Sequence, residues 1–157
     1  MKVEVSYGVS RRGIPAARTF QDWIEEAGVA LGLRGRVSVR VVGEAEGARL
    51  NREFRGREGA TNVLSFPAGT FPCRERFFGD IVLCAPRVAK EARAFGRPAR
   101  AHYAHLTIHG LLHLMGYDHL RPSARCRMES LEIRLLGALG LPDPYWLSPK
   151  VKAGSVS

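Results

Sequence analysis

The five histidines of this 157-residue chain all lie between residues 102 and 119. His109 and His113 are four residues apart, so a helix places their side chains one turn apart on the same face. Gly116 follows three residues later, where a glycine can adopt the left-handed conformation that ends a helix and turns the chain back. The spacing therefore predicts a helix and a reversal that bring His109, His113 and His119 to one point.

Three imidazoles with a fourth position left open form the pattern of a catalytic zinc site rather than a structural one. We therefore expect one Zn²⁺ per chain, held by His109, His113 and His119. Asp118 is placed by sequence to orient a ligand histidine or a bound water. His102 and His105 lie near the same helical face one and two turns earlier. Ordinary packing is the simpler interpretation of both, and contact with phosphate or orientation of a ligand is the alternative.

The net charge of +9 comes from 24 Lys+Arg residues against 15 Asp+Glu residues. Such a field attracts polyanions, so nucleic acid is the first partner to consider. The longest stretch without a charged residue, 101–117, contains four histidines and is too short and too polar to cross a bilayer. We expect a cytoplasmic protein with no membrane attachment, and three free thiols at Cys73, Cys84 and Cys126.

Apolar periodicity predicts alternating strands and helices within one domain. The expected domain covers residues 1–147, followed by a frayed tail over 148–157. The strands are expected over 3–7, 37–41, 61–66 and 81–84, and the helices over 15–31, 44–55, 86–95, 99–115 and 122–139.

The run from His109 to His119 matches the zinc-protease pattern His-Glu-x-x-His-x-x-Gly-x-x-His at every position but one. Gly110 stands where a protease has the glutamate that takes a proton from the attacking water. The whole run instead resembles the signature of the YbeY family of bacterial metal-dependent endoribonucleases. Further segments resemble that family in the same order: Leu50-Asn51 with Arg55, residues 61–66, Gly79-Asp80-Ile81, Met128-Glu129 with Leu131-Glu132, and Asp143-Pro144-Tyr145.

The resemblance implies an α+β fold, a single small domain with a four-stranded mixed sheet, about five helices around it and a zinc site at a cleft. It implies a single-strand-specific endoribonuclease that acts in ribosomal RNA maturation, at the 3′ end of 16S ribosomal RNA, and in ribosome quality control. The implied partners are ribosomal RNA precursors and the ribosome or its proteins.

The resemblance also implies a functional role for Arg55, whose guanidinium could bind the scissile phosphate through two donors. The alternative is a solvated surface arginine in the basic run from Arg52 to Arg57. Asn62, Ser65 and Asp80 are candidates to line the cleft, although each could equally cap a turn or tie a strand end. The general base is left open between water on the ion, His105 and Asp80. Two other functions stay open: a metalloprotease-like zinc hydrolase, and a ribosome-associated factor with structural zinc.

Overall fold

The computed structural model describes residues 1–68 and 76–146. Cys73 and the tail expected over 148–157 lie outside the described residues. The elements follow one another as β1 (Lys2–Tyr7), α1 (Ala17–Leu31), β2 (Arg36–Val42), α2 (Glu44–Arg55), β3 (Val63–Pro67), β4 (Phe77–Cys84), α3 (Ala85–Ala94), α4 (Ala99–Leu114) and α5 (Pro122–Ala138).

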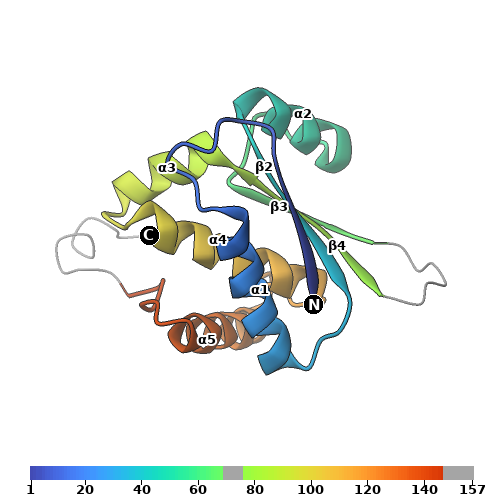
Figure 1. Cartoon of the computed structure of the whole chain (residues 1–157), viewed down its shortest axis with the longest axis vertical. Coiled ribbons are helices and arrows are strands. Elements are labelled where there is room, and N and C mark those ends of the chain that lie inside the picture. Colours follow the sequence, from blue (N-terminus) through green and yellow to red (C-terminus); the bar gives the residue numbers. More distant parts are fainter. Residues whose placement is uncertain (69–75, 147–157) are drawn as a thin grey trace.

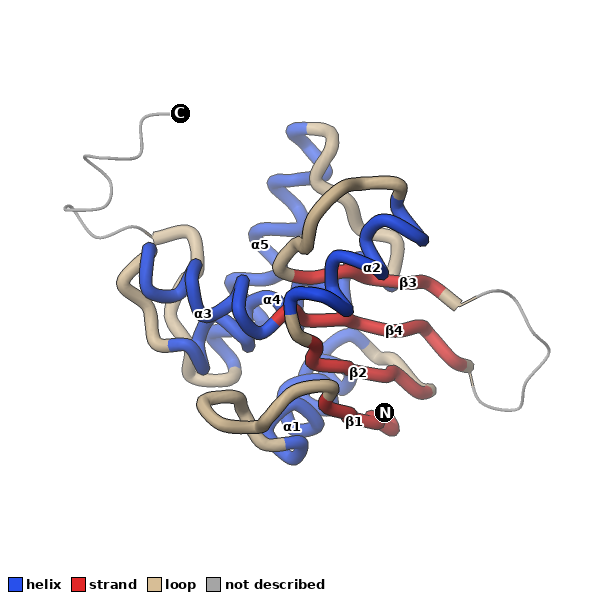
Figure 2. Tube along the Cα trace, turned by 90° about the horizontal axis from the view of Figure 1, so that it is seen from above, coloured by secondary structure: helices blue, strands red, loops and turns tan. Residues whose placement is uncertain are grey.

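The four strands form one mixed sheet in the order β1-β2-β4-β3. β1, β2 and β4 are parallel, and β3 runs antiparallel to β4 along the edge of the sheet. The mixed four-stranded sheet with five helices that the family resemblance implies is therefore confirmed. Figure 2 shows the four strands side by side, with α2 crossing above β3 and β4.

The two faces of the sheet carry separate apolar clusters, because successive side chains of a strand point to opposite faces. Ile81 and Leu83 of β4 join the larger cluster, which packs under α1 and α4. Val82 and Cys84 join the smaller cluster, which packs under α2. Figure 1 shows α2 on one side of the sheet and α1, α4 and α5 on the other. Cys84 is buried and Cys126 is exposed, and both are free thiols as expected.

Helix α4 runs through the middle of the larger layer, and 10 of its 16 residues are buried. It contacts the sheet, α1, α3 and α5. An element enclosed on so many sides is held rigidly, so side chains on its remaining face have fixed positions. Among the residues described, no helix is long and apolar enough to span a membrane.

Candidate metal centre

Three histidines come together where α4 ends. The imidazole rings of His109 and His113 have centroids 4.6 Å apart, and their Nε2 atoms are 3.1 Å apart. Gly116 then turns the chain with a φ of +94°, and the ring of His119 returns to 5.7 Å from His109 and 5.1 Å from His113. One ring nitrogen from each histidine lies within 4.8 Å of the others, so the group could hold a metal ion.

The donor atoms fit this use in spacing and in protonation. Two nitrogen ligands at 2.0–2.1 Å from a tetrahedral ion are roughly 3.3 Å apart, close to the Nε2 separation of His109 and His113. Burial, followed by the charges of His109 and His119, lowers the pKa of His113 to about 4, so its imidazole is neutral at neutral pH. A neutral imidazole offers a lone pair, and three such nitrogens suit several divalent metals without identifying one.

A buried carboxylate on α5 holds the outer side of His109. Glu132 is 0% exposed, and its Oε1 lies 3.1 Å from Nδ1 of His109. Its Oε2 lies 2.7 Å from Nε2 of His105 and accepts a hydrogen bond of 2.8 Å from the Tyr145 hydroxyl. Because an ionised carboxylate only accepts hydrogen bonds, Nδ1 of His109 carries a proton and its Nε2 lone pair faces His113.

The charge state of Glu132 follows from the same contacts. Burial, the largest single effect, would raise the pKa of Glu132, but the hydrogen bonds from His105 and His109 and the charge interactions with these two residues together outweigh it. The pKa therefore lies well below its usual range, and the side chain is an anion at neutral pH. His105, His109 and Glu132 also have ligand atoms within 4.8 Å of one another.

The sequence analysis did not single out Glu132 as a site residue, although the sequence contains a signal. On α5 it stands four residues after Met128 and three before Leu135, both of which are buried. It thus lies on the apolar stripe of the helix, where a carboxylate needs a partner. The partners come from a helix more than 20 residues earlier, so the sequence alone does not reveal which groups they are.

Arg55 ends α2 on the opposite side of the sheet, and its side chain is exposed. Its positive charge is nevertheless among the causes that lower the pKa of His113, after burial and the neighbouring imidazoles. This effect concerns His113 alone among the three histidines.

Gly110 and Ser65 fix the distance between α4 and the sheet. The Ser65 hydroxyl on β3 donates a hydrogen bond of 3.1 Å to the Gly110 carbonyl. A Cβ at position 110 would lie 2.9 Å from Cγ2 of Ile81 and 3.2 Å from Oγ of Ser65. A glutamate therefore does not fit at position 110, and the difference from the protease pattern follows from packing. Ser65 acts here as a tie between strand and helix.

Three other candidates make contacts away from the imidazoles. Asp80 is paired across the sheet with Phe66, which packs in the cluster under α2, so its side chain lies on that face. Asn62 donates a hydrogen bond of 3.0 Å to Glu91 and accepts one of 2.6 Å from the backbone N–H of Val63. Asn62 therefore ties the start of β3, whereas Asp80 lies within β4 on the face under α2.

Asp118 accepts a hydrogen bond of 3.1 Å from the backbone N–H of Leu120, in the turn that carries His119. It thus shapes the return of the chain, which positions His119 indirectly.

His102 belongs to a separate buried pair. Its Nε2 lies 2.8 Å from Oε1 of Glu91, and the residue is 3% exposed. Burial is the main cause that lowers the pKa of His102, with His105 and Arg97 acting in the same direction and Glu91 opposing them. His102 is therefore a buried packing residue that is paired with Glu91 through one ring nitrogen only, because its Nδ1 has no hydrogen-bond partner among the described residues.

The fold and this cluster together define a class: small α+β proteins with a candidate three-histidine metal centre of the kind suited to hydrolysis. The family model described as Endoribonuclease YbeY matches residues 11–140. The chain belongs to that family.

Individual relatives agree with the family model. Endoribonuclease YbeY of Stenotrophomonas maltophilia (strain R551-3) is 46% identical to this chain over 155 residues. The alignment covers 92% of this chain and 93% of the relative. Endoribonuclease YbeY of Halorhodospira halophila is 47% identical over 141 residues, covering 87% of this chain and 92% of its own. A solution structure of a Thermotoga maritima protein has the same fold, with a TM-score of 0.58 and 24% identity over 92% of this chain and 99% of that one.

Proposed function

We propose that this protein is a zinc-dependent endoribonuclease that cleaves single-stranded RNA. The observation that carries the proposal is the convergence of three imidazole nitrogens within 4.8 Å of one another. Relatives that cover almost the whole chain are named for endoribonuclease activity, which supports RNA as the substrate.

Zinc is the proposed metal, with His109, His113 and His119 as its ligands. Three imidazoles plus an open position suit the tetrahedral preference of zinc, and His119 is exposed, which leaves the outer side of the group accessible. When bound, the ion would lower the pKa of a bound water to near neutrality and polarise a phosphoryl oxygen.

In this proposal, side chains of the protein orient the metal ligands and bind the RNA phosphate. Glu132 keeps the proton of His109 on Nδ1, so that its Nε2 faces the proposed ion. Arg55 would bind the phosphate next to the scissile bond through two guanidinium donors, which also stabilises the extra negative charge of the transition state. Of the two candidate protein bases, Asp80 lies on the far face of the sheet and Nε2 of His105 is engaged by Glu132. Neither is therefore free to take a proton at the three nitrogens.

The physiological substrate that we propose is ribosomal RNA precursor, at the 3′ end of 16S ribosomal RNA, with a further role in ribosome quality control. The net charge of +9 favours association with RNA and with the ribosome. Because that RNA is transcribed and matured in the bacterial cytoplasm, we place the protein there.

Incubation of the purified protein with labelled ribosomal RNA and, separately, with casein tests the proposal. We expect cleavage of RNA alone, lost on His113→Ala and on chelation, and restored to the chelated protein by Zn²⁺. Arg55→Ala removes both donors and should lower kcat/KM by at least roughly 10- to 150-fold, which is the range for the loss of one charge-assisted hydrogen bond. Arg134→Ala is the matched control, because it removes an exposed arginine from the side of α5 that faces away from Glu132.

Cleavage of casein would contradict the proposal in favour of a protease-like hydrolase. RNA cleavage that survives both His113→Ala and chelation would come from a contaminating nuclease. Stoichiometric zinc without any RNA cleavage would favour a ribosome-associated factor with structural zinc.

A further inference from the structure

An aromatic side chain beside Arg55 is left largely in solvent. Phe54 is 64% exposed, although it lies one turn after Leu50, which packs in the cluster under α2. Helical spacing favours both residues as parts of one buried side of the helix. Only Leu50 packs in the core, and the phenyl ring of Phe54 instead faces the solvent.

The exposed ring is held in a fixed orientation. The ring of Phe66 on β3 approaches it edge-on, with centroids 5.4 Å apart and planes at 68°. Phe66 is partly buried and anchored in the cluster under α2. An edge contact on a rigid strand steadies Phe54 and does not cover it, so ring surface remains for a planar partner.

The charges around Phe54 are mostly positive and unneutralised. From residue 49 to 58 the chain carries four arginines and two glutamates. Glu53 is paired with Arg49 at 3.5 Å. Among residues 1–68 and 76–146, Arg52, Arg55 and Arg57 have no ion-pair partner.

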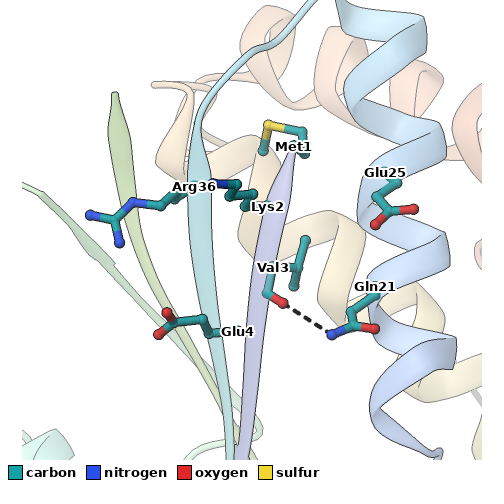
Figure 3. A pocket seen from close by; sticks show the side chains of 7 residues that line it. All are labelled: Met1, Lys2, Val3, Glu4, Gln21, Glu25 and Arg36. Carbon is teal, nitrogen blue, oxygen red and sulfur yellow. Dashed lines mark hydrogen bonds between the residues drawn. The ribbon is translucent and has the colours of Figure 1, made fainter. Parts of the chain in front are cut away.

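The cavity between α1 and the start of the sheet shows the opposite situation. It has a volume of about 460 Å³ and is lined by Lys2 and Arg36 together with Glu4 and Glu25 (Figure 3). Charges of both signs meet there, so that cavity has no surplus for an anion. The end of α2 combines surplus positive charge with an exposed aromatic ring, which is the combination that binds single-stranded nucleic acid.

Residues next to Phe54 and next to its partner Phe66 connect the ring to the candidate metal centre. Phe54 directly precedes Arg55, the residue proposed to bind the phosphate next to the scissile bond. Phe66, which supports Phe54, follows Ser65, whose hydroxyl is bonded to α4 at Gly110, the residue after His109. An RNA strand with one phosphate at Arg55 would therefore carry a neighbouring base beside the adjacent residue, Phe54.

We propose that Phe54 is a nucleobase-stacking residue, which holds one unpaired base of the RNA next to the phosphate bound by Arg55. The proposal rests on the proposed endoribonuclease function and deepens it. A base inside a duplex already stacks on its neighbours and cannot lie on Phe54, so this contact selects single strands. Because every base has an aromatic face, the contact tolerates any sequence.

Substitutions at Phe54, combined with abasic positions in the RNA, test the stacking contact in a double-mutant cycle. The substrate is a short single-stranded RNA with one mapped cut, and a series of copies carries one abasic ribose at each position in turn. We expect Phe54→Ala to raise KM about fivefold or more and to leave kcat unchanged, since the ring contributes binding away from the reacting atoms. One abasic position should cost the wild type a similar factor in kcat/KM and cost Phe54→Ala nothing.

Two further variants separate stacking from general packing. Phe54→Trp should keep the low KM, whereas Phe54→Leu, which is apolar without a ring, should behave like Phe54→Ala. Val29→Ala is the matched control, because it removes an exposed apolar side chain, 84% exposed, from α1. Thermal unfolding confirms that each variant is folded.

The outcomes separate this proposal from the proposed function. If RNA is cut in a His113-dependent way and the abasic profile is the same with and without Phe54, stacking is wrong and the nuclease function stands. Full activity of Phe54→Leu would likewise overturn stacking. If the wild type cuts no RNA at all, the proposed function is wrong and the stacking proposal is lost with it.

Discussion

Replacing Glu132 by glutamine is the most direct test of how the histidine cluster is held. Three donors converge on this fully buried carboxylate, two at Oε2 and one at Oε1. Glutamine has the same size but only one oxygen. If that oxygen keeps the two contacts from His105 and Tyr145, the amide N–H₂ meets Nδ1 of His109. His109 must then move its proton to Nε2, the atom that faces His113.

The expected magnitude follows from this conflict. Loss of the partner that orients a ligand histidine typically weakens metal binding 10- to 100-fold, which corresponds to about 1.4–2.7 kcal/mol. The metal-free protein should also lose about 1–3 kcal/mol of unfolding free energy, because a buried donor is left without its acceptor. Both effects are expected from Glu132→Gln alone, with none of the three histidines substituted.

Competition for Zn²⁺ against a coloured chelator measures the affinity, and urea denaturation measures the stability. Nitrogen-15 NMR of the imidazoles adds a direct view of the tautomer of His109. Glu26→Gln is the control, because it makes the same substitution at an exposed carboxylate on α1. It should change neither the zinc affinity nor the stability. Unchanged zinc affinity in Glu132→Gln, with the proton still on Nδ1, would refute the reasoning.

Two more predictions concern packing and pH. Gly110→Ala should destabilise the protein by about 1–2 kcal/mol in urea denaturation, because the new methyl meets Ile81 at 2.9 Å, whereas Gly137→Ala, in open space, should gain up to about 1 kcal/mol. Equal effects at the two glycines would contradict the close approach of α4. Burial lowers the pKa of His102 below 6.5 despite its bond to Glu91. The unfolded chain therefore binds this proton more readily than the folded protein does. The free energy of unfolding should fall as the pH drops below about 6.5. His102→Gln should flatten that fall in urea denaturations from about pH 7 to 5, and an unchanged slope would show that this ring does not titrate on unfolding.

The elements could be predicted where their signals are local. Helix α2 runs over Glu44–Arg55 as expected, since Gly56 ends it with a φ of +65°. β4 was placed too late, from residue 81, whereas it begins at Phe77. The reason is a bulge before Gly79, which has a φ of +140°. A Cβ at this position would lie 2.2 Å from the Phe66 carbonyl oxygen, so only glycine allows the close pairing with β3. A glycine after two aromatic residues reads as a turn in the sequence, and only the neighbouring strand shows that pairing continues through it.

In the candidate site too, residues placed by local signals could be predicted from the sequence, and residues placed by strand pairing could not. His109, His113 and His119 are brought together by one helix turn and one glycine, so their spacing contains the geometry. Asp80 depends instead on strand register, because a shift of one residue moves a side chain to the other face, and the structure places it under α2.

Gly110 shows how packing and chemistry constrain each other at this site. The missing Cβ lets α4 lie against Ile81 and Ser65, and that contact sets where His109 and His113 stand relative to the sheet edge. A glutamate there would push the helix away from β3 and separate the imidazoles from the charge of Arg55 on the opposite face. The close contact of α4 with Ile81 and Ser65 therefore disfavours the protease glutamate at position 110. The proton-accepting role must be met in another way, and the exposed side of His119 is where solvent and RNA can reach the three nitrogens.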